Sequence, residues 1–395
     1  SIETIRGWIN QNPKGDGGEG WSPYTIDLRL TNWLGYYAAV HTELDDDFQS
    51  LFINSIHEQY EFLSRHLEKN ILGNHYFEDL KAIVLCALFF SDEPVLHTAL
   101  KAFKAECKEE ILPDGMHFEL SPMYHKLIFE GVVRVAVALK DKRLDDCEVN
   151  GYLQPMLDAA WSLEEGLDRI PLFNDAGNNV AKSLQALVSA CRGHFDITPE
   201  YKSCFAESGF YIFKRNDWKL IVDAGQPGPA YIPGHAHCDA MSFELFKAGK
   251  PVVVNCGTYA YQCKERSFFR STAAHNTVMV NDTEQSQCWG AFRMAKRSKV
   301  NVVSVSENSI VIELIDQRGQ AVKRTIQFEK TLKVTDESSG NKLTAFVHPI
   351  REINMTYEGN AKTTSQRYAP EYGELVSLEA VRYEGNGKIS VEICT

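Results

Sequence analysis

The sequence predicts an α+β chain in which an all-helical domain precedes an antiparallel β domain. Apolar residues recur at three- and four-residue spacing in the first half, and at alternate positions in short runs after about residue 195. A run of helices followed by a run of strands argues against an alternating α/β fold with a parallel sheet. The length of 395 residues suits two domains, which we place at residues 1–195 and 196–395.

Six segments of the first half carry the helical spacing. They lie near residues 47–69, 76–90, 94–110, 121–140, 152–166 and 179–192. Gly, Pro, Asn or Asp residues separate them, as expected of loops. The helix near 121–140 has a clear start signal, because Ser121 is a favoured capping residue and Pro122 suits the first helical position.

The second half contains about ten segments with the alternating pattern of half-buried strands. The clearest are residues 209–215, 218–225, 241–249, 251–257, 276–282, 300–306, 309–316 and 324–337. Residues 249–250 and 307–309 carry turn chemistry between them. This number of short strands predicts a β-sandwich.

Net charge and hydropathy exclude some classes of partner. The formal charge of −12 at pH 7 argues against a nucleic-acid binder, and no apolar run approaches the roughly 18 residues of a membrane span. An anionic substrate would need a locally basic region. The densest basic stretch is RMAKRSK at 293–299, with Arg266 and Arg270 upstream, although a solvated surface is the plainer interpretation.

The ten cysteines form no CxxC pair, which argues against a zinc ribbon or a thioredoxin-type site. Their scattered positions favour a reducing compartment over a disulfide framework. The chain starts at Ser1 without a methionine or an apolar leader, so we expect a removed leader or a fragment.

Two polar stretches in the first half contain candidate functional residues. In GNHYFEDL (73–80), Asn74 and His75 precede a predicted helix, where Asn74 could simply cap it. In DGMHFELSPMYHKL (114–127), Tyr124 and His125 fall in the first turn of a predicted helix and Glu119 precedes them. Side chains in the first turn of a helix can face either a cleft or the core, and the spacing does not decide between these two positions for Tyr124 and His125.

Two further stretches suggest a metal site. GHAHCDAMSFELF (234–246) begins like the HxHxDH zinc motif of metallo-hydrolases, but Ala240 occupies the sixth position and the strand–helix alternation of that fold is absent. On a strand, His235 and His237 would point to one face. His275 in RSTAAHNTVMVND (270–282) could approach from a neighbouring strand, and Asn255 could add an oxygen. Such ligands would suit zinc.

These four stretches resemble, in this order, the heparinase II/III-like family of polysaccharide lyases. NPKGDGGEGWSPYTIDLRLTNW at 12–33 and GKPVVVNCGTYAY at 249–261 extend the resemblance over most of the chain. The resemblance implies an α/α toroid followed by an antiparallel β-sandwich. Because the match begins well inside the helical domain of the family, we expect an incomplete toroid.

The resemblance also implies β-elimination at a uronic acid, in which a base removes the C5 proton and an acid protonates the leaving oxygen at C4. Asn74 and His235 match the residues that neutralise the substrate carboxylate, with His75 beside them. Tyr124 matches the tyrosine that transfers protons, and Tyr261 loosely matches a second one.

Substrate contacts are expected from two arginines, because guanidinium groups bind carboxylates bidentately. Arg29 and Arg270 fill this role, and His125 and Glu119 join them as predicted substrate-binding residues. The expected partner is an acidic polysaccharide or oligosaccharide, either an alginate or a glycosaminoglycan. The family resemblance places such an enzyme in the periplasm or outside the cell, against the indication from the cysteines.

The metal ligands implied by the resemblance are His237, Asn255 and His275. One divalent ion, zinc by preference, is expected there. Asn255 replaces an aspartate of the family, and a neutral amide is a poorer ligand, so the alternative is a site held by hydrogen bonds alone. Two other functions stay open: a glycan-binding or scaffold protein of the same fold, and a hydrolase that uses Glu119 and Asp239.

Overall fold

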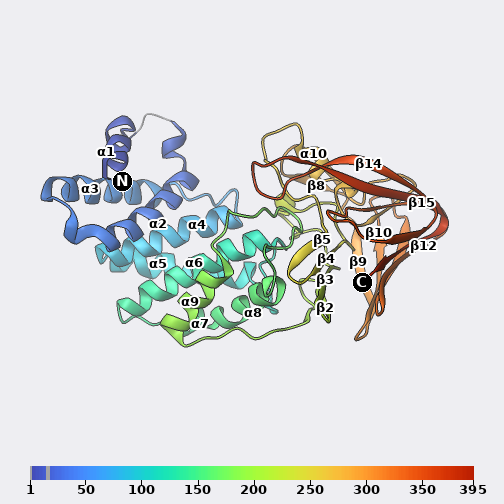
Figure 1. Ribbon diagram of the computed structural model, residues 1–395. Helices are drawn as coiled ribbons and strands as arrows, with labels where there is room; N and C mark the ends of the chain where they lie inside the picture. Colours follow the sequence, from blue (N-terminus) through green and yellow to red (C-terminus); the bar gives the residue numbers. More distant parts are fainter. Residues whose placement is uncertain (1, 15–17) are drawn as a thin grey trace. The chain divides into compact units, whose positions relative to one another are not determined.

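The structure is a computed structural model that describes residues 2–14 and 18–395 (Figure 1). Helices occupy the first half of the chain and antiparallel strands the second, which confirms the predicted fold class. Part of the stretch 12–33 that carries the family resemblance, residues 15–17, lies outside the described residues, as does Ser1. No helix within 2–14 and 18–395 combines the length and apolar composition that crossing a membrane requires.

The chain forms two compact units. The first consists of residues up to 110 together with 128–153, and the second of residues 111–127 together with 154–395. Residues 111–127 and 154–195, which the sequence analysis assigns to the helical domain, therefore belong to the unit that contains the strands. The boundary near residue 195 between a helical and a strand domain stays a prediction.

The first unit is built from helices. Their bounds are α1 Ile2–Gln11, α2 Pro23–Val40, α3 Asp46–Leu63, α4 Asn74–Phe90, α5 Glu93–Glu110, α6 Pro122–Asp141 and α7 Cys147–Gly151, with α6 beginning in the second unit. α4 packs against both α2 and α5. Fully buried apolar side chains such as Ile26, Phe52 and Phe77 drive this packing, because removing them from water stabilises the folded state. The spacing analysis did not predict α1 and α2.

The second unit contains two antiparallel sheets and a small hairpin (Figure 1). The five-stranded sheet has the order β1-β2-β3-β4-β5, with bounds Cys204–Phe205, Phe210–Arg215, Trp218–Asp223, Phe243–Lys247 and Lys250–Val253. The eight-stranded sheet has the order β13-β15-β12-β11-β10-β9, with β14 paired to β15 and β6 paired to β12. Its bounds are β6 Val278–Val280, β9 Lys299–Val305, β10 Ser309–Ile315, β11 Ala321–Phe328, β12 Thr331–Val347, β13 Met355–Glu358, β14 Asn360–Tyr368 and β15 Val376–Cys394. The hairpin pairs β7 Gln287–Trp289 with β8 Arg293–Ala295.

One hydrophobic core joins the two sheets. Leu220 and Leu245 of the five-stranded sheet pack in the same buried cluster as Ile312 and Val334 of the eight-stranded sheet. Two antiparallel sheets that share a core between their inner faces are a β-sandwich. The structure therefore confirms the predicted sandwich. The predicted run 324–337 is two strands, because a turn at residues 329–330 separates β11 from β12.

The opposite face of the five-stranded sheet is also buried. Leu163 of α8 (Leu153–Glu164) and Leu120 pack with Phe210 and Phe246 of that sheet. Gly115 makes this approach possible, because a Cβ at this residue would lie 2.2 Å from the carbonyl oxygen of Pro155. Helix α9 (Leu184–Phe195) leads into the strands. The segment 111–127 is thereby packed onto the sandwich, and it brings Glu119 and Tyr124 with it.

Candidate active site

The second unit brings four of the predicted site residues together. The hydroxyl of Tyr124 lies 2.8 Å from the hydroxyl of Tyr261, within hydrogen-bond distance. The imidazole of His235 stacks on the ring of Tyr124, with centroids 3.9 Å apart and an interplanar angle of 18°. Glu119 accepts a hydrogen bond from Nδ1 of His235. The result is a cluster of two phenols, one imidazole and one carboxylate.

Tyr124 is positioned by the start of α6, as the Ser121–Pro122 signal predicts. The helix begins at Pro122, and Oγ of Ser121 accepts a hydrogen bond from the backbone N–H of Tyr124 at 3.3 Å. The same hydroxyl donates to the carbonyl oxygen of Asp175 at 2.6 Å. This cap fixes the first turn of α6 against residue 175 and sets the direction of the Tyr124 side chain.

His235 and His237 do not lie on a strand, and the prediction that they share one face is wrong. Pro233 and Gly234 form a short 3-10 helix that ends at His235, and β4 begins only at Phe243. A 3-10 turn followed by irregular backbone rotates successive side chains away from the two-residue alternation of a strand. The two histidines therefore have separate sets of partners, and only His235 faces Tyr124.

The environment makes His235 and Glu119 a charged pair. Burial acts to lower the pKa of His235, but the adjacent carboxylate of Glu119 outweighs it and raises that pKa above its usual value. Burial acts to raise the pKa of Glu119, and the contact with His235 lowers it overall. The raised pKa favours an imidazolium against the face of Tyr124, with the buried carboxylate of Glu119 as its counter-charge.

Both tyrosines are protonated in the absence of a ligand. Burial raises the pKa of Tyr124 well above 10, and the nearby Tyr261 and Asp175 add to that increase. Burial also raises the pKa of Tyr261, although the guanidinium of Arg266, 5.1 Å from the ring centroid, acts in the opposite direction. One of the two hydroxyls consequently donates to the other, and the pair can carry a proton between them.

A buried ion pair beneath this cluster was missed by the sequence analysis. Nη2 of Arg266 donates to Oδ2 of Asp175 at 2.7 Å, and Thr258 donates to Oδ1 at 3.0 Å. Burial acts to raise the pKa of Asp175, but Arg266 and then His237 lower it far below its usual range. The polar run Asn174–Asp175 inside the apolar stretch 170–176 is the sequence signal that could have indicated it.

His237 and His275 come together as predicted. Nδ1 of His237 lies 3.3 Å from Nε2 of His275, and Nε2 of His237 lies 2.8 Å from Oδ1 of Asp175. Asn255 does not share this contact in the described residues: its Oδ1 accepts from the backbone N–H of Asn276 at 3.0 Å, and its Nδ2 donates to Ser242 at 3.4 Å. Two imidazoles converge, and the amide has partners of its own.

Arg270 and His125 are buried and bound to backbone groups. The guanidinium of Arg270 donates to the carbonyl oxygens of Ala236, Arg293 and Ala291 at 3.0, 3.1 and 3.3 Å. Nε2 of His125 donates to the carbonyl oxygen of Met156 at 3.0 Å, while Nδ1 accepts from the N–H of residue 117 at 3.2 Å. These contacts argue against direct substrate binding, which stays a prediction for both residues.

Glu119 was predicted to bind substrate, but in the structure its carboxylate contacts His235. Its carboxylate is buried and bonded to His235, so the structure gives it the task of orienting and charging that imidazole. Asp239, the other carboxylate of the hydrolase alternative, accepts from the backbone N–H of Asn174 at 2.6 Å. Both carboxylates are buried, and each accepts a hydrogen bond inside the protein through one of its oxygens.

Asn74, His75 and Arg29 belong to the first unit. Asn74 is buried at the first position of α4, and Gly73 takes the cap position before it with φ of 58°. Nδ1 of His75 lies 3.0 Å from Oε2 of Glu68. Arg29 donates to Gln59 at 2.6 Å and lies over Trp8 at 3.8 Å, and burial lowers its pKa to about 10. Their roles in the site stay predictions.

Exposed aromatic side chains border the tyrosine–histidine cluster, and the sequence analysis missed them. Phe292, between β7 and β8, is 40% exposed and lies 5.3 Å from the ring of Tyr261 and 6.0 Å from that of His235. Tyr372 is 43% exposed and lies 5.5 Å from Tyr261. Exposed rings next to a polar cluster offer flat apolar faces to a ligand.

Comparison with known proteins identifies the family. The model of the heparinase II/III N-terminus matches residues 2–202, and that of the heparinase II/III-like C-terminal domain matches residues 198–364. The chain therefore belongs to the heparinase II/III-like family.

Among curated proteins, the chain is similar to heparin-sulfate lyases of several bacteria. That of Pedobacter heparinus is 25% identical over 313 residues, which cover 70% of this chain and 47% of the relative. That of Bacteroides thetaiotaomicron is 22% identical over 395 residues, covering 86% and 55%. The chain thus spans about half the length of the curated relatives that it matches.

Solved structures show the same fold. A crystal structure of heparinase III superimposes with a TM-score of 0.80 at 16% identity and covers 99% of this chain and 72% of that chain. Heparan sulfate lyase HepC from Pedobacter heparinus gives a TM-score of 0.66 at 18% identity and covers 99% and 71%. At these identities the likeness establishes the arrangement of helices and sheets.

Proposed function

We propose that this chain is a polysaccharide lyase that cleaves a glycosaminoglycan of the heparan sulfate type by β-elimination. The observation that supports this most is the hydrogen-bonded pair Tyr124–Tyr261 stacked against the charged pair His235–Glu119. The names of the curated relatives supply the substrate class. Because such polymers lie outside cells, we also propose a periplasmic or secreted location.

The reaction needs a base, an acid and neutralisation of a carboxylate. The C5 proton of a uronate is weakly acidic while the neighbouring carboxylate is ionised, and charge builds up on that group when the proton leaves. The imidazolium of His235 supplies positive charge for it. Proton transfer by a positioned side chain adds roughly 10²–10⁴-fold.

The two tyrosines divide the proton transfers. Tyr124 as phenolate takes the C5 proton, the electron pair of that bond forms the C4=C5 double bond, and the C4–O4 bond breaks. Tyr261 donates its proton to the leaving O4. The proton held by Tyr124 then crosses the 2.8 Å hydrogen bond to Tyr261, which restores the starting state without consuming water.

Formation of the phenolate is the demanding step, because burial raises the pKa of Tyr124. The cation of His235 stacked on the ring and the hydroxyl of Tyr261 both stabilise the phenolate. Glu119 favours the charged form of His235. Arg266, which is bonded to Asp175, lies next to the ring of Tyr261. Asn74 and His75 are proposed to assist carboxylate neutralisation, which Asn74→Ala would test separately.

The test is formation of an unsaturated product. We expect the protein to generate ultraviolet-absorbing ends from heparan sulfate, in a panel that also contains heparin, chondroitin sulfate and alginate. Tyr124→Phe should lose at least about 100-fold in rate, because it removes the hydroxyl that transfers the proton. Tyr357→Phe is the matched control, since it removes a hydroxyl from the same unit that bonds only to Met355 in the described residues.

The alternative function is glycan binding without catalysis. Its supporting observation is the raised pKa of Tyr124, which makes the resting phenol a weak base, together with the exposed rings of Phe292 and Tyr372. Binding of the polymer without an ultraviolet-absorbing product would establish it. New reducing ends without that absorbance would instead indicate a hydrolase and contradict the lyase mechanism.

We also propose that His237 and His275 hold a zinc ion. Two ligands at a tetrahedral zinc with Zn–N bonds of about 2.0–2.1 Å lie roughly 3.3–3.4 Å apart, and the facing nitrogens of the two rings are 3.3 Å apart. Zinc binding would require Nε2 of His275 to lose its proton and its contact of 3.1 Å with the carbonyl oxygen of Phe269. Burial lowers the pKa of His237 to about 4, which keeps the neutral imidazole that binds metals. Asp175 on its other nitrogen matches the carboxylate partner of metal-bound histidines.

Bound zinc would cross-link the segments that carry His237 and His275. Elemental analysis of the purified protein should find one zinc per chain, and His275→Ala should lose it. A metal-free protein that unfolds at the same temperature with and without added zinc would leave the two rings joined by hydrogen bonds alone.

A further inference from the structure

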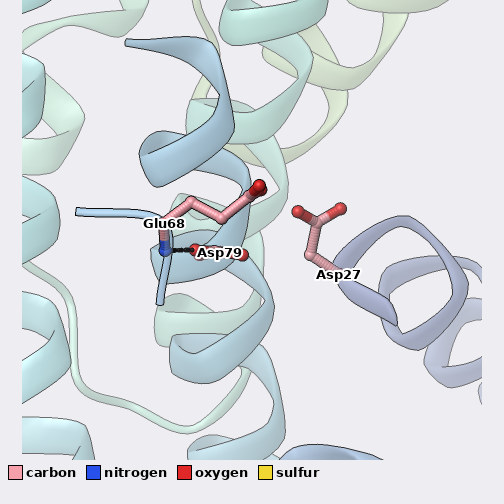
Figure 2. A group of neighbouring side chains, drawn as sticks. All are labelled: Asp27, Glu68 and Asp79. Carbon is pink, nitrogen blue, oxygen red and sulfur yellow. Dashed lines mark hydrogen bonds between the residues drawn. The ribbon is translucent and has the colours of Figure 1, made fainter. Parts of the chain in front are cut away.

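A second group of charged side chains lies in the first unit, apart from the tyrosine–histidine cluster. Asp27 on α2, Glu68 in the segment between α3 and α4, and Asp79 on α4 each place one carboxylate oxygen within 4.8 Å of the other two. Figure 2 shows the carboxylates of Asp27 and Glu68 pointing toward one another, with Asp79 beside them.

Asp27 has no nitrogen or hydroxyl donor among the described residues, and its side chain is 0% exposed. Its one polar partner there is the carboxyl group of Asp79, whose pKa a hydrogen bond with Asp27 lowers. Oδ1 of Asp79 also lacks a nitrogen or hydroxyl donor in the described residues, while its Oδ2 accepts from the backbone N–H of Glu68 at 2.6 Å. Burying a carboxylate without donors is strongly unfavourable, so a native protein either protonates it or supplies a cation.

The positive side chains around the group have other partners. Lys81, which faces Asp27, forms a buried ion pair with Glu78. Nδ1 of His75 lies 3.0 Å from Glu68, and Arg29 donates to Gln59 at 2.6 Å. Burial and the neighbouring acids raise the pKa of Asp27, and burial raises that of Asp79 to about 7. Lys81 lowers the pKa of Asp27 only in part, so the buried carboxyl group is either protonated or needs a further positive charge.

We propose that Asp27, Glu68 and Asp79 bind a hard divalent cation of the calcium or magnesium class. The donor set contains oxygen only, which such ions prefer over nitrogen or sulfur. Calcium–oxygen distances of about 2.3–2.6 Å allow two ligands up to roughly 5 Å apart, which accommodates the observed spacing. Because Asp27 is buried, its ionised carboxylate needs a nearby cation, whereas water stabilises the carboxylates of an exposed acidic cluster.

The ion would join three parts of the helical unit. It would connect α2, the segment of residues 64–73 and α4. Among the three acids, the described hydrogen bonds to backbone groups join only Glu68 to Asp79. Glu68 also contacts His75 in the first turn of α4, next to Asn74. Cation binding would therefore fix the start of α4 whether or not the protein is a lyase.

The test is direct binding to protein stripped of metal with a chelator. Titration calorimetry with calcium chloride, and separately with magnesium chloride, should show one site. The thermal unfolding midpoint should rise by several degrees at about a hundredfold excess over Kd, since a ligand of the folded state stabilises it. Asp27→Asn should weaken binding at least about tenfold and abolish the shift.

The stripped proteins give a second comparison. Without cation, Asp27→Asn should unfold at the same or a higher temperature than the wild type, because the amide cannot ionise and the buried carboxyl group can do so only at a cost in free energy. Glu68→Gln, at a half-buried position, should also weaken binding and guards against misfolding of the first variant. Glu130→Gln is the control with the same charge change in the same unit, and it should bind like the wild type.

Two results would overturn the proposal. The first is absence of heat and of any thermal shift with both ions in the wild type, which would leave Asp27 and Asp79 as a pair that shares a proton. The second is equal binding by wild type and Asp27→Asn, which would place the ion elsewhere. Neither result depends on lyase activity.

Discussion

The raised pKa of His235 comes mainly from Glu119, and Asp175 adds to it. Burial acts to lower the histidine pKa, and the carboxylate contact reverses that direction. Glu119→Gln removes the charge and keeps a hydrogen-bond acceptor, so the pKa of His235 should fall below its usual value. As the pH rises, His235 of the variant would then lose its proton at a lower pH than His235 of the wild type.

The measurement is a pH profile of kcat/KM on heparan sulfate. The alkaline limb of the variant should move to lower pH, with a loss of at least about tenfold near pH 8 that shrinks toward pH 6. Glu371→Gln, at a carboxylate that is not fully buried in the same unit, should leave the profile unchanged. An unshifted alkaline limb in Glu119→Gln would show that catalysis does not need the imidazolium.

His125 illustrates a pH effect on stability rather than on catalysis. Burial lowers its pKa to about 3, and the ring is neutral between two backbone groups. In the unfolded chain the residue takes up a proton near pH 6.5, so acid favours unfolding. Its contribution to stability is complete above pH 6.5 and is lost as the pH falls toward 3.

The expected loss from this residue is about 2–3 kcal/mol between pH 6.5 and 4.5. Urea unfolding at those two pH values measures it. His125→Gln should unfold more easily at neutral pH but show a smaller difference between the two pH values. An identical pH dependence in wild type and variant would assign the acid sensitivity to other groups.

At the scale of elements, the buried ion pair Arg324–Asp336 connects two strands of the sandwich to the loops that carry His237 and His275. Arg324 on β11 contacts Asp336 on β12 through two hydrogen bonds of 2.7 and 2.8 Å, with side-chain exposures of 1% and 0%. The same guanidinium donates to the carbonyl oxygens of Met241 and Asn276, both at 2.8 Å. These residues follow His237 and His275 in the chain.

Arg324→Met should lower the free energy of unfolding by about 3–5 kcal/mol, because it leaves Asp336 buried without a counter-charge. The adjacent register pair Lys323–Glu337 is the matched control, since it lies 3.0 Å apart but is 44% and 40% exposed. Lys323→Met should cost less than about 1 kcal/mol. Equal losses in the two variants, measured by denaturant unfolding, would contradict the argument from burial.

Secondary structure was predictable because its signal is local. The apolar spacing located α3 to α6, and the Ser121–Pro122 pair located the start of α6. The alternation failed at residues 235–239, where Pro233 and Gly234 turn the chain before the strand begins. It also failed at 324–337, where a turn too short to interrupt the pattern divides two strands.

At the scale of the whole molecule, the net charge of −12 opposes approach of a polyanion. The Debye length falls from about 30 Å at 0.01 M salt to about 10 Å at 0.1 M, so moderate salt screens this repulsion. We expect kcat/KM on heparan sulfate to rise over that range. The contacts of the site itself are partly buried and should weaken only at higher salt.

Steady-state rates at fixed pH across a sodium chloride series measure this effect. A short oligosaccharide carries fewer charges and should show a smaller increase than the polymer, which serves as the internal comparison. A fall in kcat/KM from the lowest salt onward would show that a basic surface, and not the net charge, governs the encounter.

The resemblance to the heparinase II/III-like family, carried by short sequence stretches, predicted much of the site. Tyr124, His235 and Tyr261 were predicted, and His237 was predicted to meet His275. The ion pair of Asp175 and Arg266 was not, because it joins positions 91 residues apart in the chain. The exposed ring of Phe292 escaped notice for the same reason, since its place beside His235 depends on the β7–β8 hairpin.

Periodicity established the order of helices and strands, because burial of one face of an element leaves a local trace in the chain. The charge of His235 leaves no such trace. It depends on the carboxylates of Glu119, 116 residues away, and Asp175, which outweigh the effect of burial, and the hydrogen bond between Tyr124 and Tyr261 joins residues 137 positions apart. Folding brought those groups together, and desolvation there set which of them hold protons.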